Sequence, residues 1–352
     1  MVSSVRQTHG RGTGSFCESA PRMRNTASYP PGMRIPVTSI VSSGLPFVKN
    51  RFPAAAFENQ LRRASPEERP TGKQNRQKSP AEKKECGIAH ERGREVYRYE
   101  THCHTAPVSQ CANASAEDTV RFYKQIGYDG IFITNHFLDG NICPDARAMH
   151  YADQIEFYFS DYEKAAAYGE KIGIKVFPGV ELSYKGTDFL VYGLEKEWYR
   201  THPEIMAMRK SEELPYLMNA GAFVVQAHPY REAYYIDHIR LFPRCVHAVE
   251  VTNSGQAWEA NAITDVYAEQ YGLLKTCGSD NHWGSEVFAK LREKGYRPAI
   301  AGMAGETAVS SVQDYIAQVR GGMMRMFLMN ERGDITEMNG QGRPDRGKER
   351  TN

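Results

Sequence analysis

The sequence predicts an α/β protein built on a β/α barrel. Between residues 96 and 278, seven short apolar runs rich in β-branched and aromatic residues alternate with stretches of helical periodicity. This alternation favours parallel strands joined by right-handed helical crossovers. The later runs are as apolar as the earlier ones, which favours a closed barrel over an open sheet. An open doubly wound sheet is the alternative, although no Gly-x-Gly-x-x-Gly motif follows the first run.

The expected elements have local causes in the sequence. A helix at 115–126 starts at the N-cap Ser115, carries two acidic residues in its first turn and stops at Gly127. Three further helices are expected at 160–172, 204–219 and 253–271, each ending at or close to a glycine. The seven strands are expected at 96–101, 130–135, 175–182, 189–194, 222–227, 248–252 and 273–278. Beyond them, a helix is expected at 309–319 and a strand at 324–328.

Charge divides the chain into a basic segment and an acidic body. The net charge of +2 combines 17 Lys and Arg against 8 Asp and Glu in residues 1–95 with 27 against 34 in the remainder. We expect residues 1–94 to be a disordered basic segment, residues 95–329 to form the barrel domain, and residues 330–352 to be a polar tail. The basic segment is interpreted as a tether or as sequence translated from an early start codon; a transit peptide is the less favoured alternative.

Cysteine usage and hydropathy bear on the setting of the protein. The seven cysteines are odd in number and lack disulfide-like spacing. No apolar run of about 18 residues is present to span a bilayer, and residues 1–30 lack the apolar core of a secretory signal. We therefore expect a cytoplasmic protein with no membrane partner. The oligomeric state is left open.

Two histidines, His102 and His104, follow the first expected strand as a His-x-His pair. On an extended backbone, residues i and i+2 point to the same face about 6.6 Å apart, so both imidazoles can bind one metal ion. The pair alone is weak evidence, because histidines at a strand end are also satisfied by hydrogen bonds to the backbone.

Four further expected strands end in ionisable side chains, which strengthens the metal interpretation. These side chains are His136, Glu181, His228 and a second i, i+2 pair, Asp280 and His282. Burying any one of them costs several kcal/mol unless it is paired or coordinated. The carboxyl ends of barrel strands converge on one mouth, where barrel enzymes place their chemistry. The sequence therefore predicts a metal cluster at that mouth.

Imidazole nitrogens and carboxylate oxygens suit Zn²⁺, Mn²⁺ or Fe²⁺. Seven ligands are too many for one tetrahedral ion, so we expect at least two ions, with Glu181 or Asp280 suited to bridge them. Two ions about 3.5–4 Å apart clamp a phosphate and lower the pKa of a bridging water. This arrangement predicts hydrolysis of phosphate esters.

Taken in order, the motifs His-x-His, Thr-Asn-His, Gly-Val-Glu, Ala-His-Pro and Ser-Asp-Asn-His resemble those of the PHP superfamily, named for its polymerase and histidinol phosphatase members. The resemblance covers residues 96–282. It implies a distorted, seven-stranded, TIM-like barrel that typically holds three divalent metal ions and hydrolyses phosphoesters; for this chain we expect two or three. By motif position it implies these metal ligands: His102, His104, His136, Glu181, His228, Asp280 and His282.

Two positions depart from the commoner family pattern. Many members have Asp or His five or six residues beyond the second histidine, where this chain has Ser109-Gln110-Cys111. Cys111 is then either a thiolate ligand or part of a turn. Many members also have His where this chain has Asp188, which we take as a replacement metal ligand. If both replacements fail to bind, a two-metal site is expected instead of a three-metal site.

We expect Asp280 and His104 to act catalytically at the metal-activated water, and Arg231 to fork onto phosphate oxygens. Glu250 is interpreted as an ion-pair partner in the barrel wall, and Asn253 as lining the mouth. The expected substrate is a small phosphomonoester or a nucleotide-type ester. A nuclease acting on DNA or RNA ends is one alternative, although the acidic body argues against it. The other alternative is a metal-stabilised binding module that has lost catalysis.

Overall fold

A computed structural model describes residues 96–295, 299–330 and 334–337 of the chain. The basic segment predicted for 1–94 lies outside these residues, and so does most of the predicted tail at 330–352. The helices are α1 (Ala116–Gln125), α2 (Tyr151–Ile172), α3 (Lys196–Thr201), α4 (Lys210–Asn219), α5 (Trp258–Tyr271), α6 (Ser285–Glu293) and α7 (Val312–Arg320). The strands are β1 (Tyr97–Cys103), β2 (Gly130–Ile133), β3 (Lys175–Pro178), β4 (Val180–Tyr184), β5 (Thr187–Tyr192), β6 (Phe223–Ala227), β7 (Ala248–Asn253), β8 (Leu274–Gly278), β9 (Ile300–Gly305), β10 (Met324–Met329) and β11 (Ile335–Glu337).

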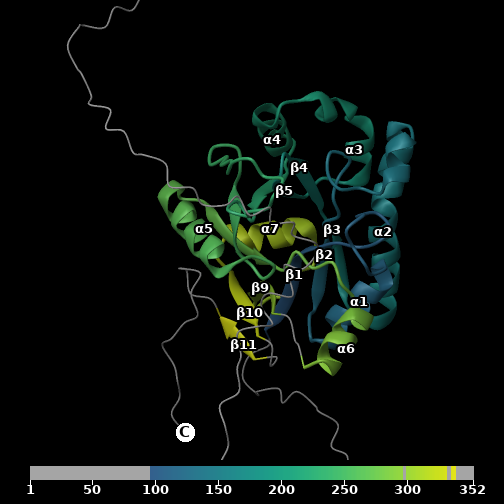
Figure 1. The fold of residues 1–352 in the computed structure, drawn as a ribbon, viewed down its shortest axis with the longest axis vertical. Coiled ribbons are helices and arrows are strands. Elements are labelled where there is room, and N and C mark those ends of the chain that lie inside the picture. The colour runs from purple at the N-terminus through teal and green to yellow at the C-terminus, as the bar shows by residue number, and fades with distance from the viewer. Residues whose placement is uncertain (1–95, 296–298, 331–333, 338–352) are drawn as a thin grey trace, which may run out of the picture. The chain divides into compact units, whose positions relative to one another are not determined.

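The strands form two mixed sheets flanked by helices, which confirms the predicted α/β class. One sheet has the order β11-β10-β9-β1-β2-β3 and the other β4-β5-β6-β7-β8. Strands β1, β2 and β3 run parallel, as do β6, β7 and β8. Figure 1 shows α2 and α5 on opposite sides of these strands.

The closed seven-stranded, TIM-like barrel is not confirmed, because hydrogen bonding within the described residues leaves two separate sheets. Within the described residues, two isolated parallel bridges link the sheets, Cys103 at the end of β1 to Asn281 beyond β8, and His136 beyond β2 to Glu181 of β4. Both bridges lie at the ends of strands that carry predicted ligands. The sheets therefore approach each other at the site without forming a continuous ring of strands.

The strands divide into two sheets within the stretch 175–182, which was predicted as one strand. The strand breaks at Gly179, so that β3 belongs to one sheet and β4 to the other. A Cβ on Gly179 would lie 2.8 Å from Cγ2 of Thr134, so only glycine allows this close approach. Directly afterwards Lys185 and Gly186 both have positive φ, 53° and 81°, and close a two-residue hairpin. The hairpin makes β5 antiparallel to β4 and β6, where parallel strands were predicted.

Several other boundaries differ from the prediction. Helix α2 begins at Tyr151, nine residues before the expected start at 160. Helix α5 begins at Trp258 because Asn253 belongs to β7. The expected helix at 204–219 is divided into a 3-10 turn, Pro203–Ala207, and α4. The elements α3, α6, β9 and β11 were not predicted.

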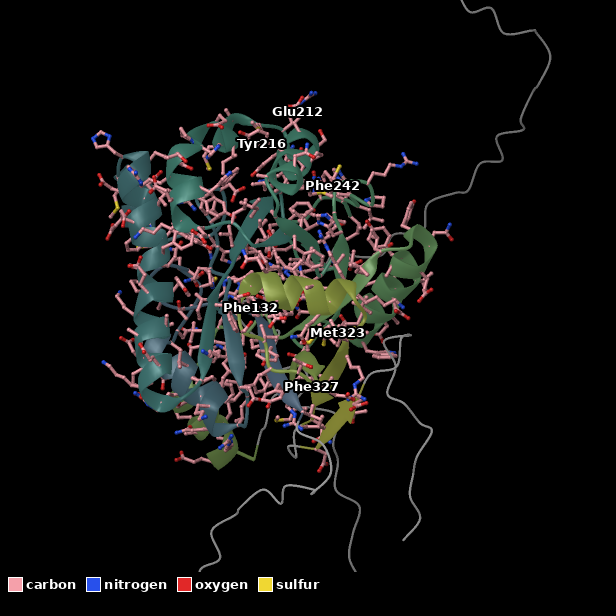
Figure 2. All side chains as sticks on the ribbon, turned by 180° about the vertical axis from the view of Figure 1, so that it is seen from behind. Phe132, Glu212, Tyr216, Phe242, Met323 and Phe327 are labelled. Atoms are coloured by element: carbon pink, nitrogen blue, oxygen red, sulfur yellow. The ribbon has the colours of Figure 1, made fainter. Side chains whose placement is uncertain are left out.

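Helix α7 packs against both sheets and helps to hold them together. Its Tyr315 is fully buried, and the centroid of its ring lies 4.6 Å from that of Phe132 in β2 and 5.7 Å from that of Tyr192 in β5. Figure 2 labels Phe132 beside this helix. A second apolar cluster joins α1, α2 and α6 to the six-stranded sheet, and includes the stacked rings of Phe122 and Phe288. No helix in the described part of the chain is long and apolar enough to cross a membrane.

Candidate metal centre

The fold brings all eight predicted metal ligands into one cluster. His102 lies in β1, Glu181 in β4 and Asp188 in β5, whereas the other five follow strands β1, β2, β6 and β8. The cluster contains four groups of three residues, and within each group the three potential ligand atoms lie within 4.8 Å of one another. These groups are His104, His136 and His282; His102, His104 and Glu181; His102, His228 and Asp280; and Glu181, Asp188 and His228.

Glu181 lies at the centre of the cluster and is fully buried. Its Oε2 is 2.6 Å from Nδ1 of His136 and 3.3 Å from Nε2 of His104. Its Oε1 is 3.1 Å from Nε2 of His102 and 3.5 Å from Nε2 of His228. Neither oxygen accepts a hydrogen bond of normal geometry from any described residue. A buried carboxylate that is surrounded by imidazoles but lacks a hydrogen bond fits a metal ligand.

Asp280 presents the second carboxylate of the cluster. Its Oδ1 is 3.1 Å from Nε2 of His104 and 3.4 Å from Nε2 of His102, while its Oδ2 is 3.8 Å from Nε2 of His228. Asp280 and His228 both have positive φ, 53° and 26°. Such a conformation costs a non-glycine residue free energy and concentrates at functional sites, so the backbone is strained where it directs these two side chains.

Glu250 of β7 fixes the orientation of His102. Its Oε1 is 3.0 Å from Nδ1 of His102, which leaves Nε2 of that ring directed at Glu181 and Asp280. Its Oε2 accepts hydrogen bonds from the backbone N–H of His228 and from Nδ2 of Asn253. Glu250 is therefore a site residue, because a carboxylate behind a metal-binding histidine sets its tautomer and raises its basicity.

Ser109 plays the corresponding part behind His104. Its Oγ is 3.0 Å from Nδ1 of His104 and donates a 2.9 Å hydrogen bond to Oδ1 of Asn135. The same Oγ accepts a hydrogen bond from the backbone N–H of His136. The sequence placed Ser109 in the stretch that departs from the family pattern, and the structure shows that it positions two predicted ligands.

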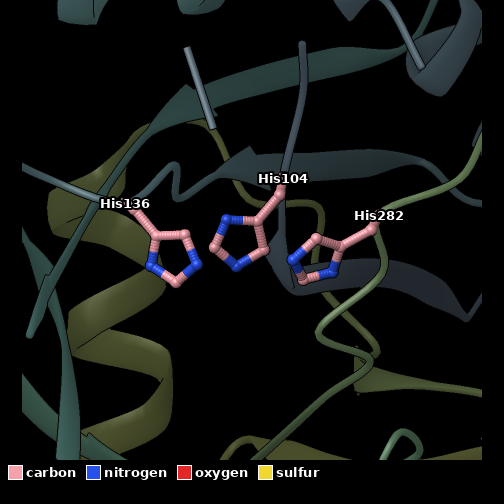
Figure 3. Close-up of side chains that lie close together, drawn as sticks. All are labelled: His104, His136 and His282. Carbon is pink, nitrogen blue, oxygen red and sulfur yellow. The ribbon is translucent and has the colours of Figure 1, made fainter. Parts of the chain in front are cut away.

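Cys111 lies beside His282, one of the three histidines shown in Figure 3. Its Sγ is 3.1 Å from Nε2 of His282. Burial alone would raise the pKa of the Cys111 thiol, but the His136 and His282 imidazoles lower that pKa to about 6. The Cys111 thiol thus contacts a predicted metal ligand.

Asp188 and Arg231 lie at one edge of the cluster. Oδ2 of Asp188 is 4.0 Å from Nε2 of His228 and 3.6 Å from Nη1 of Arg231. Burial and the neighbouring Glu181 carboxylate raise the pKa of Asp188. Arg231 also contacts the hydroxyl of Tyr235, and it remains partly exposed. The guanidinium is therefore placed where the buried cluster meets the surface.

The charges in the cluster oppose one another. Burial disfavours a charged His102, but the Glu250, Asp280 and Glu181 carboxylates raise the pKa of that imidazole well above its usual value. Burial and the neighbouring His282 and His136 rings lower the pKa of His104 to about 3, so its ring stays neutral. Imidazole and carboxylate side chains can both bind a cation when the imidazole is neutral and the carboxylate is ionised.

Comparisons with known proteins bear on the fold. No family model matches the chain, and no curated protein matches it. The chain is similar to the solved structure of a two-domain protein from Bacteroides vulgatus that contains a predicted PHP-like metal-dependent phosphoesterase. The TM-score is 0.50 at 16% sequence identity, over 70% of this chain and 69% of the other.

The chain shares its fold with this PHP-like structure. The resemblance inferred from the order of the motifs is thereby confirmed at the level of the fold. Looser likenesses are to a protein from Bifidobacterium adolescentis assigned as a metal-dependent phosphoesterase, with TM-score 0.37 and 14% identity over 55% of this chain and 90% of that one. The structure of PsfC from Pseudomonas syringae has a TM-score of 0.42 and 18% sequence identity, over 63% of this chain and 88% of PsfC.

Within this PHP-like fold, the residues present fit divalent metal ions. Besides both oxygens of Glu181, the buried atoms without a hydrogen-bond partner in the described structure include Nδ1 of His136 and both ring nitrogens of His228. Leaving so many polar atoms unsatisfied would cost several kcal/mol in the absence of a ligand. Coordination of cations by these nitrogens and oxygens removes that cost.

Proposed function

We propose that this protein is a metal-dependent hydrolase of phosphoesters. The observation that carries the proposal is the convergence of five histidines and three carboxylates on a buried point at which Glu181 has no hydrogen-bond donor among the described residues. Metal-binding groups gathered in this way serve catalysis when a partly open edge lets a substrate reach them. Asp280, His282 and Arg231 provide that edge, because each is partly exposed.

The donor set suits two or three divalent ions, Zn²⁺, Mn²⁺ or Fe²⁺. His102, His104, Glu181 and Asp280 would hold one ion, and Glu181, Asp188 and His228 a second. Bound ions would polarise a phosphoryl group and lower the pKa of a water. Glu181 belongs to two of the groups of potential ligands, so it is the carboxylate best placed to be shared.

The protein's own side chains then perform three tasks. Glu250 accepts the Nδ1 proton of His102 and keeps the ring in place. Asp280, whose carboxylate is 12% exposed, orients the attacking water and accepts its proton. Arg231 turns from Asp188 to the phosphoryl oxygens, where its planar fork can donate two parallel hydrogen bonds.

The substrate we propose is a small phosphomonoester or a nucleotide-type ester. Among the described residues, the guanidinium of Arg231 contacts the edge of the cluster, and it suits a substrate with one terminal phosphate group. We further propose a reducing, cytoplasmic setting, because the described cysteines Cys103, Cys111, Cys143, Cys245 and Cys277 are all free thiols.

Hydrolysis of p-nitrophenyl phosphate by the metal-loaded full-length protein tests the proposal. His104→Ala and Asp280→Ala should each lower kcat by about 10²-fold or more, because each removes a group at the reacting centre. His238→Ala is the matched control, since His238 is 64% exposed and contacts Asp237. If both cluster variants hydrolysed the ester as fast as wild type, the proposed mechanism would be wrong.

Two further substrates separate the alternatives. Cleavage of a single-stranded oligonucleotide in preference to the monoester would indicate a nuclease. A protein that binds metal tightly but hydrolyses neither substrate would be a metal-stabilised binding module. We expect hydrolysis of the small ester and little or no cleavage of the oligonucleotide.

A further inference from the structure

Cys111 has a position unlike that of the other described cysteines. The thiols of Cys103 and Cys277 are buried and donate to the backbone carbonyls of Phe132 and Phe327, over 3.2 and 3.5 Å. Cys111 is only partly buried, and its sulfur faces Nε2 of His282 at 3.1 Å. The thiols of Cys103 and Cys277 thus have backbone partners, whereas that of Cys111 faces a ring nitrogen of the predicted ligand His282.

The His282 ring is held so that a lone pair faces the sulfur. Its Nδ1 lies 2.8 Å from the backbone carbonyl oxygen of Asp280, which can only accept a hydrogen bond. Nδ1 therefore carries the proton, and Nε2 is left as the unprotonated nitrogen. An unprotonated imidazole nitrogen and a thiol sulfur this close together form one edge of a coordination site.

His136 belongs to the same group of rings as His282. It is only 9% exposed, and its Nδ1, which lies 2.6 Å from Oε2 of Glu181, has no hydrogen-bond partner of normal geometry among the described residues. The rings of His136 and His282 lie on either side of His104, at centroid distances of 4.5 and 4.3 Å (Figure 3). One nitrogen from each of the three rings lies within 4.8 Å of the others.

His104 is the member of this trio that is engaged elsewhere. Its Nδ1 contacts Ser109, and its Nε2 faces Glu181 and Asp280. Sγ of Cys111 lies 3.1 Å from Nε2 of His282, and a ring nitrogen of His282 lies within 4.8 Å of one from His136, so Cys111 supplies a further donor beside these two rings. These three donors come from segments that follow β1, β2 and β8.

We propose that Cys111 is a thiolate ligand of a metal ion held together with His136 and His282, and that this position selects Zn²⁺ or Co²⁺ over Mn²⁺ or Mg²⁺. The inference rests on the proposed metal centre and adds a chemically distinct position to it. Thiolate sulfur is a soft donor that favours zinc-like ions, whereas carboxylate oxygens suit Mn²⁺ and Mg²⁺ equally well. The groups of potential ligands that contain Glu181, Asp188 and Asp280 include no sulfur, so the protein would have two kinds of metal position that prefer different ions.

Titration of the chelator-stripped full-length protein with Co²⁺ tests this position spectroscopically. A thiolate bound to Co²⁺ gives a sulfur-to-metal charge-transfer band in the near ultraviolet, which imidazole and carboxylate ligands do not give. We expect the band in wild type and its complete loss in Cys111→Ser. Cys245→Ser is the matched control, because Cys245 is also a partly buried free thiol and is not among the residues that surround the cluster.

A second variant separates the donor from the fold. Cys111→Asp replaces the soft donor by a hard one at the same place, so it should bind as many metal ions as wild type without the band. Its preference for Zn²⁺ over Mn²⁺, measured by competition between the two ions, should fall by about tenfold or more. Circular dichroism and the thermal midpoint would establish that both Cys111 variants are folded.

The outcomes distinguish this inference from the proposed function. If wild type binds Co²⁺ at the imidazole and carboxylate positions but shows no charge-transfer band, Cys111 is not a ligand and the hydrolase proposal is unaffected. If the band persists in Cys111→Ser, another cysteine is the donor and the assignment is overturned. If stripped wild type binds no Co²⁺ at all, the metal centre itself fails.

Discussion

Glu181 and Asp280 bring negative charge to the centre of the cluster, while buried acceptors behind the imidazoles decide how those rings point. His102 is held by Glu250 and His104 by Ser109. The sequence indicated seven of the ligands because each lies at or just beyond the end of an apolar run, whereas Asp188 was indicated by the family resemblance alone. The sequence also indicated Glu250 as an ion-pair partner, but not that its partner is His102, 148 residues away. Such a contact depends on how the two sheets approach each other and leaves no periodic pattern.

Glu250→Gln tests the role of that carboxylate. The substitution keeps the size of the side chain but removes the charge that orients His102, so the affinity for Zn²⁺ should fall by about 10- to 100-fold. Competition with a chromophoric chelator measures that affinity. Glu259→Gln, on the exposed side of α5, is the control and should bind Zn²⁺ as wild type does. An unchanged affinity in Glu250→Gln would mean that the hydrogen bond to His102 is not important for metal binding.

Arg231→Lys tests the proposed phosphate contact. Lysine keeps the positive charge near Asp188 but loses the planar fork, so KM for the phosphoester should rise by about tenfold while kcat changes less. Steady-state kinetics on the small ester separate the two constants. Arg244→Lys, on the exposed part of the same connection, should leave both constants unchanged. A fall in kcat with no change in KM would instead assign Arg231 to the chemical step.

The strands meet closely at the site because glycines allow them to. A Cβ on Gly278 of β8 would lie 2.6 Å from Oε1 of Glu250 and 2.7 Å from Cβ of His102. Real Cβ atoms do not approach so closely, so these neighbours would have to move. The contact between β8, β7 and β1 at this point is therefore part of how His102 is positioned.

Gly278→Ala should weaken both folding and metal binding. Overpacking of this kind costs about 1–3 kcal/mol of stability and should push Glu250 away from His102. Gly130→Ala is the control: its Cβ would meet the Tyr99 ring at 2.8 Å, at the opposite end of β2 from His136. Thermal melts and Zn²⁺ titrations should show that both variants lose stability and that only Gly278→Ala loses metal affinity. Equal metal affinities in the two variants would argue against the positioning role.

The departures from the predicted elements have the same physical origin in close packing and turns. The stretch 175–182 has the composition of one buried strand, and only the crowding of Gly179 against Thr134 and Tyr192 shows why it divides. Strand β9 has the sequence Ile-Ala-Gly-Met-Ala-Gly, whose small residues gave no β-branched pattern. Gly302 in that strand must be small because its Cβ would lie 2.4 Å from the carbonyl oxygen of Tyr99. Local composition therefore predicted the strands that carry ligands better than it predicted how the sheets join.

The buried charge of the cluster links metal binding to the stability of the whole domain. In the metal-free protein the carboxylates raise the pKa of His102 and His136 well above the usual 6.5, although burial opposes this, and the pKa of His282 is also raised. Despite burial, His136 and His102 lower the pKa of Glu181 well below 4.5. Protons on the imidazoles thus take the place of metal ions in balancing the carboxylates.

The signs of these shifts predict how stability depends on pH. A raised histidine pKa means that the folded protein binds more protons than the unfolded chain, so its contribution is complete below pH 6.5 and is lost as the pH rises through the raised values. A lowered carboxylate pKa contributes above pH 4.5 and is lost on acidification. The metal-free domain should therefore be most stable between these two limits, and should lose stability toward alkaline pH.

Metal ions should remove that alkaline loss, because they replace the protons and bind best to neutral imidazoles. At about one hundred times the dissociation constant, a single bound ion adds about 2.7 kcal/mol to the free energy of unfolding. We expect the difference in Tm between Zn²⁺-loaded and chelator-stripped protein to grow as the pH rises from about 6 to about 8. Thermal melts of both forms across this range measure the difference. Parallel Tm curves for the two forms would show that these imidazoles do not exchange protons for metal, and the cluster would then be an ion-pair network that serves folding alone.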